Sequence, residues 1–238
     1  DHLEGTQCGR DYPCGELIKV SPCGGKVLFA RYDLTRLGRE VSRDVFAGRP
    51  DNMWRFAELL PVFQDENIVT LGEGATPLLN ASTIGKSLNM GHLFIKEEGL
   101  NPTGTFKARG LSAAISKAKE LGAKGFTIPS AGNAAGAAAV YCARAGLDVK
   151  VYMPQDAPDA NKKECLLADS ELNLVDGHIG DAGRQAVAVA EEENLFDLST
   201  LKEPYRAEGK KTMALEIAMQ LGWRMPDTII YPTGGGTG

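Results

Sequence analysis

The feature that most constrains the fold is a regular alternation, from about residue 71 onward, of short apolar runs with longer amphipathic ones. The alternation predicts strands over residues 92–96, 125–129, 148–153, 172–175 and 228–231, and helices over residues 105–121, 133–145, 159–168, 181–193 and 205–221. Because parallel strands need long connections that are usually helical, this order predicts βαβ units and an α/β fold built on a parallel sheet. Such sheets bind ligands in the loops that follow the carboxyl ends of their strands.

Composition narrows the range of partners. The chain has 238 residues, 24% of them charged, and a formal net charge of -5, which disfavours nucleic acid and anionic membranes as partners. No stretch approaches the roughly 18 to 20 apolar residues that a membrane helix needs. The start of the chain has no basic segment followed by an apolar one, so no signal peptide is predicted and the cytoplasm is the expected location. Because there is no initiator Met, we expect residues to be missing in front. A small-molecule substrate is the expected partner.

The first loop that can carry chemistry runs from residue 101 to residue 110 and reads Asn-Pro-Thr-Gly-Thr-Phe-Lys-Ala-Arg-Gly. Its turn residues place Lys107 in the first turn of a helix, where the backbone dipoles disfavour a protonated amine. A lysine that is desolvated there has a lowered pKa, as a Schiff-base nucleophile requires. The alternative is a solvated lysine in a helix-starting turn, since lysines are mostly exposed.

The second loop, residues 129–136, again joins a predicted strand to a predicted helix. It contains Ser130, Ala131, Gly132 and Asn133. Small residues and Asn at a helix N-terminus allow backbone N–H groups to reach a carboxylate or a phosphate, and the Asn side chain could orient a ring hydroxyl. The alternative is an Asn that only caps its helix.

The third loop follows the predicted strand at residues 228–231 and is rich in glycine. It contains Gly234, Gly235, Gly236, Thr237 and Gly238. Successive glycines expose backbone N–H groups in a concave nest that suits a phosphate. A simple turn would not need three glycines, whose ordering costs conformational entropy. We therefore predict an anion-binding loop here.

The three loops, in this order, resemble those of the fold type II pyridoxal-phosphate enzymes, the tryptophan synthase β-like group. The resemblance covers about residues 71–238. It implies pyridoxal 5′-phosphate as cofactor, bound to Lys107 as a Schiff base beside Phe106. It also implies that Asn133 contacts the ring O3′ and that the loop Gly234–Gly238 holds the phosphate.

Within this group, the chain resembles threonine synthases most closely. Residues 71–78 (Leu-Gly-Glu-Gly-Ala-Thr-Pro-Leu) are similar to a Gly-Glu-Gly-x-Thr-Pro-Leu motif of that family, which implies that Thr76 lines the substrate site together with residues 130–133. Threonine and serine dehydratases usually have His after the Asn of the second loop, where this chain has Ala134. Cysteine synthases usually have Val-Lys-Asp-Arg around the lysine, whereas this chain has Phe-Lys-Ala-Arg. The implied reaction converts O-phospho-L-homoserine and water to L-threonine and phosphate. Another elimination or replacement enzyme of the group, including a dehydratase or a cysteine synthase-like enzyme, and an inactive homologue remain as alternatives.

The first 35 residues differ from the rest. Many threonine synthases begin with a zinc-ribbon-like module of two Cys-x-x-Cys knuckles, and this segment resembles a degenerate form of it. Cys8, Cys14 and Cys23 supply three ligands and His2 would be an improvised fourth, whereas a structural zinc site needs four closed ligands. We therefore predict no bound metal.

The resemblance also implies a division into domains. Residues 1–35 would form the degenerate module and residues 36–70 a helical lead-in. Residues 71–105 and 175–238 would belong to the large domain, and residues 106–174 would form a small domain, with the cofactor in the cleft between the two. Because family members continue for on the order of 100 residues beyond the glycine loop, we expect a fragment that lacks the residue facing the pyridine nitrogen. Family members are commonly dimers, so a homodimer is possible.

Overall fold

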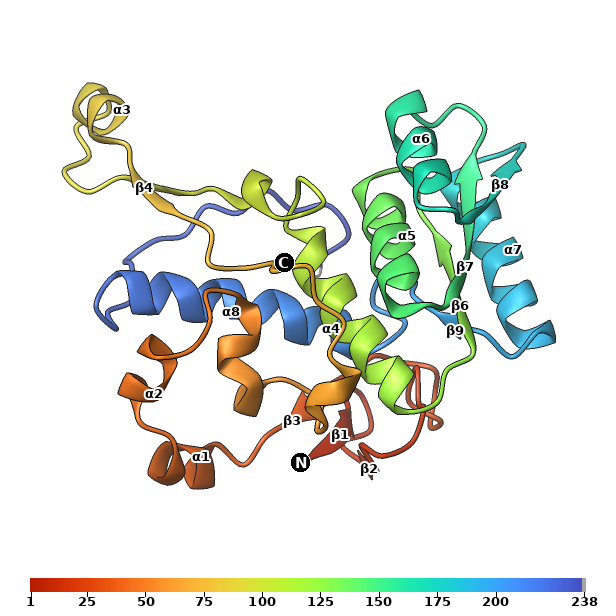
Figure 1. Ribbon diagram of the computed structural model, residues 1–238, viewed down its shortest axis with the longest axis horizontal. Helices are drawn as coiled ribbons and strands as arrows, with labels where there is room; N and C mark the ends of the chain where they lie inside the picture. The colour runs from red at the N-terminus through yellow and green to blue at the C-terminus, as the bar shows by residue number, and fades with distance from the viewer. Residues whose placement is uncertain (237–238) are drawn as a thin grey trace.

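The computed structural model describes residues 1–236. Helices and strands alternate from β5 to α8, as the sequence predicts (Figure 1). The α-helices are α1 (Leu34–Glu40), α2 (Arg43–Ala47), α3 (Ser82–Ser87), α4 (Lys107–Glu120), α5 (Asn133–Ala145), α6 (Asp159–Leu167), α7 (Ile179–Glu192) and α8 (Tyr205–Gln220). The strands are β1 (His2–Gly5), β2 (Asp11–Tyr12), β3 (Leu28–Arg31), β4 (Leu78–Asn80), β5 (Phe94–Lys96), β6 (Gly125–Pro129), β7 (Asp148–Pro154), β8 (Glu171–Val175) and β9 (Phe196–Asp197). Short 3-10 helices lie at Met53–Leu59, Asp65–Asn67 and Glu98–Leu100.

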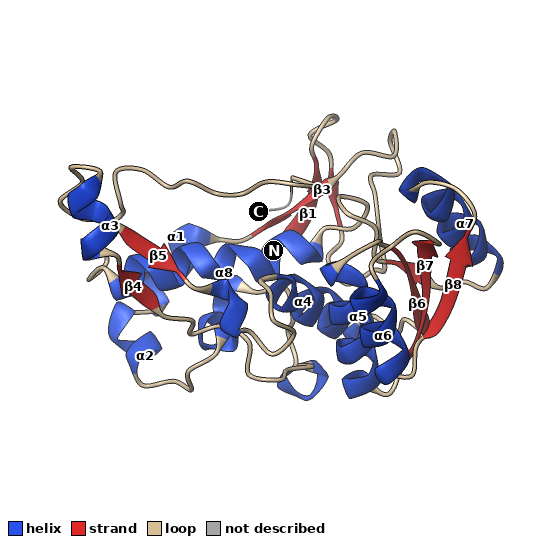
Figure 2. Cartoon of the chain, turned by 90° about the horizontal axis from the view of Figure 1, so that it is seen from above, coloured by secondary structure: helices blue, strands red, loops and turns tan. Residues whose placement is uncertain are grey.

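A four-stranded parallel sheet with the order β8-β7-β6-β9 forms one lobe of the molecule. The register of β6 on β7 places Gly125 opposite Asp148 and Pro129 opposite Tyr152. Helices α5 and α6 cover one face of the sheet and α7 covers the other (Figure 2). The predicted parallel sheet flanked by helices is therefore confirmed. The pairing of β9 with β6 was not predicted, because a strand of two residues leaves no periodic pattern.

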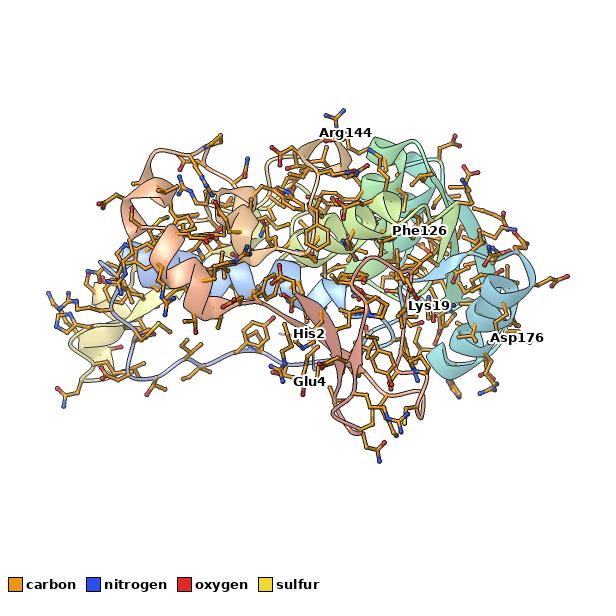
Figure 3. The ribbon with its side chains drawn as sticks, turned by 90° about the horizontal axis from the view of Figure 1, so that it is seen from below. His2, Glu4, Lys19, Phe126, Arg144 and Asp176 are labelled. Atoms are coloured by element: carbon orange, nitrogen blue, oxygen red, sulfur yellow. The ribbon has the colours of Figure 1, made fainter. Side chains whose placement is uncertain are left out.

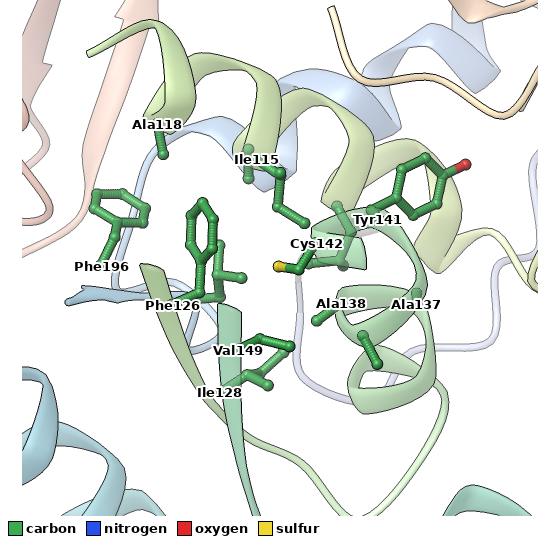
Figure 4. Packing of buried hydrophobic residues seen from close by; sticks show 14 of the residues in the cluster. Ile115, Ala118, Phe126, Ile128, Ala137, Ala138, Tyr141, Cys142, Val149 and Phe196 are labelled. Atoms are coloured by element: carbon green, nitrogen blue, oxygen red, sulfur yellow. The ribbon is translucent and has the colours of Figure 1, made fainter. Parts of the chain in front are cut away.

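The main hydrophobic core lies between this sheet and the helices α4 and α5. Phe126 and Phe196, from the neighbouring strands β6 and β9, meet edge to face with ring centroids 6.3 Å apart (Figure 4). Alanines and the buried Cys142 fill the helix side, so that the helices approach closely and leave few voids. This packing fixes α4 against the sheet, and with it the position of residue 107.

Helices α4 and α8 cross at close range in the middle of the molecule (Figure 1). The contact depends on two glycines. A Cβ atom on Gly110 would lie 2.9 Å from the Arg206 carbonyl oxygen, and one on Gly209 would overlap the Arg109 carbonyl oxygen. Because side chains are absent there, the start of α4 lies directly beside the first turns of α8.

The N-terminal segment forms a separate three-stranded antiparallel sheet with the order β2-β1-β3. Leu3 of β1 and Leu28 of β3 are buried in the main core, which attaches this sheet to α4 and its surroundings. Figure 3 shows His2 and Glu4 on β1, seen from below. After this sheet and the helices α1 and α2, the 3-10 helix Met53–Leu59 begins at a cap formed by the Asn52 side chain.

One predicted strand is wrong. Residues 228–231 have no regular secondary structure, and Ile230 is 90% exposed. A strand exists only if a neighbouring strand takes up its backbone hydrogen bonds, and nothing within residues 1–236 pairs with this segment. In the same range, no helix is both long enough and apolar enough to cross a membrane.

Candidate functional site

Lys107 is the first residue of α4, as predicted, and its side chain is half-buried. Its backbone N–H donates to Thr105 Oγ1 at 3.2 Å, which holds the turn that leads into the helix. Its Nζ lies 4.5 Å from the centroid of the Phe106 ring. Burial, together with the charge of Arg206, lowers the pKa of the Lys107 amine below its ordinary value. The alternative of a fully solvated lysine does not describe this side chain.

Helix α8 brings two further cations to the same place. The Lys210 side chain is only 4% exposed, and its Nζ lies 5.0 Å from the centroid of the same Phe106 ring. Burial, followed by the charges of Arg206 and Lys107, lowers the pKa of Lys210 to about 7. Arg206 is buried and donates through Nη1 to the Leu198 carbonyl oxygen at 2.6 Å.

Glu203 is an acid whose charge acts on both Arg206 and Lys210. It is buried and accepts the backbone N–H groups of Tyr205 (2.6 Å) and Arg206 (3.1 Å), so it caps the start of α8. Burial raises the pKa of Glu203 to about 7, although the charge of Arg206 opposes this. Near neutral pH the cluster therefore holds more positive than negative charge.

The glycine loop lies next to this cluster. A Cβ atom on Gly235 would lie 2.9 Å from the Thr200 side chain, whose hydroxyl accepts from Arg206 Nη1 at 3.3 Å. Gly236 has a φ of +84°, a left-handed conformation that favours glycine. The ring of Tyr231, just before the loop, meets the Phe106 ring edge-on at 5.7 Å.

These contacts place Phe106 of the first loop beside Tyr231, the residue just before the third loop. Gly234 is exposed, and Thr237 and Gly238 lie outside the described residues. A half-buried amine, neighbouring cations and a glycine loop with Gly236 in the left-handed conformation suit a cofactor that carries both an aldehyde and a phosphate. The residues present therefore fit pyridoxal 5′-phosphate.

The second loop lies at the carboxyl end of β6, where α5 begins at Asn133. The Ser130 hydroxyl accepts the backbone N–H of Gly132 at 3.2 Å, and Ala131 packs at the edge of the core. Asn133 is exposed, and its Oδ1 accepts from Asn161 Nδ2 at 3.4 Å. No hydrogen bond, ion pair or ring contact within residues 1–236 joins this loop to Lys107. The substrate and cofactor contacts assigned to residues 130–133 stay predictions.

Thr76 occupies a different environment from the one expected of a substrate-facing residue. It is 3% exposed, its hydroxyl donates to Glu98 Oε1 at 2.5 Å, and it accepts from Arg109 Nη2 at 3.2 Å. Arg109 is fully buried and also binds Glu216, with Nη1 and Nη2 each 2.7 Å from a carboxylate oxygen. Thr76 is thus part of a buried ionic network, and its contact with a substrate stays a prediction.

The three N-terminal cysteines do not meet at one point. Cys8 Sγ lies 3.6 Å from both the Tyr12 and the Ser21 hydroxyl oxygens, whereas the Cys14 thiol donates to the Asp1 carbonyl oxygen at 3.1 Å. His2 faces Asp11, with Nε2 and Oδ1 3.2 Å apart. Within residues 1–236 no three His, Cys, Asp or Glu side chains are grouped so as to hold a metal ion.

Sequence reasoning missed Arg206 and Lys210, which the structure places beside Lys107. One pattern could have indicated them. Two cations at positions i and i+4 of a helix lie on the same face and repel each other, so such a pair on a helix face that packs inside the protein suggests a functional use.

Comparison with known proteins gives relatives over most of the chain. Residues 69–238 match the family described as "Pyridoxal-phosphate dependent enzyme". Threonine synthases of Methanocaldococcus jannaschii and Methanosarcina acetivorans are 35% and 34% identical over 96% and 98% of this chain. That of Synechocystis is 42% identical over 74% of the chain. The chain spans 56%, 56% and 46% of the lengths of these three relatives.

Solved structures with the same fold have other names. A maize serine racemase superposes with a TM-score of 0.58 at 26% identity, covering 62% of this chain and 45% of that one. A threonine deaminase of Solanum lycopersicum superposes with a TM-score of 0.56 at 25% identity, covering 61% of this chain and 40% of that one. These superpositions support the fold type II assignment.

Proposed function

The chain belongs to the family of pyridoxal-phosphate-dependent enzymes, and we propose that it carries the cofactor-binding part of a threonine synthase. The proposed reaction converts O-phospho-L-homoserine and water to L-threonine and phosphate. The observation that carries the proposal is the half-buried Lys107 amine at the start of α4, beside the Phe106 ring, which itself meets Tyr231 just before the glycine loop. The identities of 34–42% to threonine synthases favour this substrate over others.

Each loop has a proposed task. When bound, the cofactor supplies an electron sink for the substrate's Cα. Lys107 holds the cofactor covalently and, once displaced by the substrate amine, moves protons at Cα and Cβ because it stays within reach of both. The backbone N–H groups of residues 130–133 hold the substrate carboxylate, and Asn133 orients the ring hydroxyl. Residues 234–238 hold the cofactor phosphate, and Arg206 adds positive charge beside them.

Trapping the bound cofactor by reduction tests whether Lys107 is the residue that carries it. The chain is mixed with pyridoxal 5′-phosphate, reduced with borohydride and mapped by mass spectrometry. We expect the label on Lys107, no label and no cofactor absorption band in Lys107→Ala, and wild-type labelling in Lys124→Ala, whose exposed side chain serves as the control. A label on another lysine, or a band that persists in Lys107→Ala, would overturn the assignment.

The substrate is tested by product analysis on the protein as its own gene expresses it. O-phosphohomoserine, O-phosphoserine and threonine are offered separately. Formation of threonine and phosphate from the first supports the proposal. Formation of 2-oxobutanoate from threonine would instead favour a deaminase, the activity named for a structural neighbour. A protein that binds cofactor and turns over none of the three would be an inactive homologue.

We further propose the two-domain division, in which residues 106–174 form the small domain. We also propose that the protein forms a homodimer. The lobe formed by β6, β7 and β8 with α5 and α6 supports a separate small domain, and the same lobe also contains α7 and β9, which lie beyond residue 174. Light scattering on the purified protein tests the second, because a monomer mass would contradict it.

A further inference from the structure

We propose that Lys107 and Lys210 form a proton-sharing pair in which Lys210 accepts the proton that Lys107 must lose before it bonds to the cofactor. Lys210 then acts as a positioning residue for a proton, without itself bonding to the cofactor. The proposal rests on the proposed function, since it presupposes that Lys107 is the attachment site.

The close crossing of α4 and α8 brings the two amines together. Gly110 lies one turn after Lys107 on the same face of α4, and a Cβ atom on it would lie 3.2 Å from Lys210 Cε. The Lys210 side chain therefore runs over Gly110 towards the start of α4. Its Nζ and that of Lys107 lie 5.0 and 4.5 Å from the same Phe106 ring centroid, so their separation cannot exceed the sum of these distances.

The charges around the pair are mostly positive, which disfavours two protonated amines side by side. On α8 the pair faces Arg206, and the buried Glu203, just before α8, acts on both Arg206 and Lys210. Glu208, which lies between these two residues in sequence, pairs with Lys211. Of the other acids nearby, Asp197 on β9 accepts from the Ser199 backbone and hydroxyl.

The remaining charged groups nearby are already paired with each other. Glu98, in the loop before α4, binds Arg109 of α4 through two N–H groups. No salt bridge to Lys107 exists within residues 1–236. Among residues 1–236 the cations around the pair outnumber the acids, so the pair is expected to hold a single proton near neutral pH, and its two proton losses belong to the pair as a whole.

Lys210 is the member that is neutral first. It is the more buried of the two, and burial with the charges of Arg206 and Lys107 lowers its pKa to about 7. In the transfer, an N–H bond of the Lys107 ammonium breaks and an N–H bond forms at Lys210 Nζ. Charge is conserved, and the lone pair freed on Lys107 becomes available to the carbonyl carbon of the cofactor. Solvent reaches the half-buried Lys107, so water can carry the proton between the two nitrogens.

The first test measures protonation directly and needs no cofactor. Lysines carrying ¹³C at Cε are titrated by NMR from pH 6 to pH 11, and the Lys210 signal is assigned by its loss in Lys210→Gln. We expect a Lys210 midpoint near neutrality in the wild type. In Lys107→Met the midpoint should rise by about one pH unit, because a positive charge within ten ångströms is removed. In Lys107→Arg, which keeps the charge, it should stay low. A midpoint near 10 in the wild type, or equal midpoints in the Met and Arg variants, would overturn the pair.

The second test measures the rate at which cofactor attaches to Lys107. In Lys210→Gln we expect attachment to slow by about tenfold at pH 7 and to approach the wild-type rate at pH 10, where solvent base replaces Lys210. Lys211→Gln is the matched control, because Lys211 is the next residue of α8 and pairs with Glu208 instead. A uniform loss at all pH values would indicate a merely structural role and would overturn the proposal.

The two proposals fail in different ways. If trapping places the cofactor on another lysine, the proposed function fails while the NMR midpoints still report on the pair. If the cofactor is trapped on Lys107 and Lys210 titrates as an ordinary lysine, only the pair is wrong.

Discussion

Two ionic clusters lie at the interface of α4 and α8, and they differ in charge balance. The first centres on Arg109 and contains Glu98, Glu216 and Lys96, two cations with two carboxylates. The second contains Lys107, Lys210 and Arg206 with Glu203, and within residues 1–236 Asp197 is the other acid that acts on Arg206. In the first, each charged group has an ion partner within 2.8 Å. In the second, burial works against the charged forms of all four.

The difference indicates that the first cluster stabilises the fold and that the second serves the functional site, although both lie between the same two helices. A balanced, fully hydrogen-bonded cluster can be buried at tolerable cost, and it fixes the positions of the elements that it joins. A cation-rich cluster costs stability and is retained where a ligand or a reaction needs it. Lys107 and Arg109 are only two residues apart, yet they point into opposite kinds of environment.

The largest expected effect comes from breaking the balanced cluster. Arg109→Met leaves Glu98 and Glu216 buried with Lys96 as their only cation, so we expect a loss of about 3–5 kcal/mol in the free energy of unfolding. Urea denaturation measures it. Arg184→Met, at a position whose side chain is 76% exposed, is the control and should change stability by less than about 0.5 kcal/mol. A loss below about 1 kcal/mol in Arg109→Met would contradict the structural role of this cluster.

The sequence predicted the strands and helices that carry this site better than it predicted the side chains around Lys107. The bounds of β6 and α5 agree with the prediction to the residue, because each is a periodic run closed by Pro or Gly. The strand predicted at residues 228–231 fails because an apolar run does not reveal whether a partner strand exists. Lys210 was missed because its neighbour Phe106 is about a hundred residues away, and no local pattern reports which face of α8 meets α4.

Glu73 tests whether hydrogen bonds can stabilise a buried carboxylate in place of a cation. Glu73 is fully buried and accepts from the Tyr141 and Ser112 hydroxyls at 2.5 Å each, as well as from Trp54 Nε1 at 3.0 Å. Glu73→Gln replaces one acceptor oxygen by a donor, so at least one of these bonds is lost. We expect a loss of about 2 kcal/mol in the free energy of unfolding by urea.

Glu66→Gln, at an exposed position, is the control for this change and should be neutral. A neutral Glu73→Gln would mean that hydrogen bonds alone do not hold the Gly-Glu-Gly segment against α4 and α5.

The pH dependence of stability should distinguish the two clusters. The folded pKa of Lys210 is lowered to about 7, so between pH 7 and its ordinary value of 10.5 the unfolded chain binds more protons than the folded one. Stability from this group therefore rises with pH across that window. For Glu203, whose folded pKa is raised to about 7 from 4.5, stability falls as pH rises from 4.5 to 7. The cation-rich cluster thus costs most near neutral pH.

We test this difference with a pair of denaturation series. Between pH 7 and pH 9 the wild type should gain about 2 kcal/mol relative to Lys210→Met, in which this titration is absent. Lys124→Met, at an exposed position, is measured in parallel and should follow the wild type. Equal pH profiles for the wild type and Lys210→Met would show that Lys210 is an ordinary lysine.

The smallest effect is expected from Lys107 itself. Lys107→Met removes a half-buried cation from a cluster that already has too many, and relief of its repulsion with Lys210 offsets the lost contact with the Phe106 ring, which is worth about 0.5–1 kcal/mol. We therefore expect the free energy of unfolding to stay constant or to rise by about 0.5 kcal/mol, while cofactor attachment is lost completely. A stability loss above about 1 kcal/mol would place Lys107 with Arg109 among the residues that hold the fold. The contrast between the two clusters would then no longer separate structure from function, because both would be needed for the folded state.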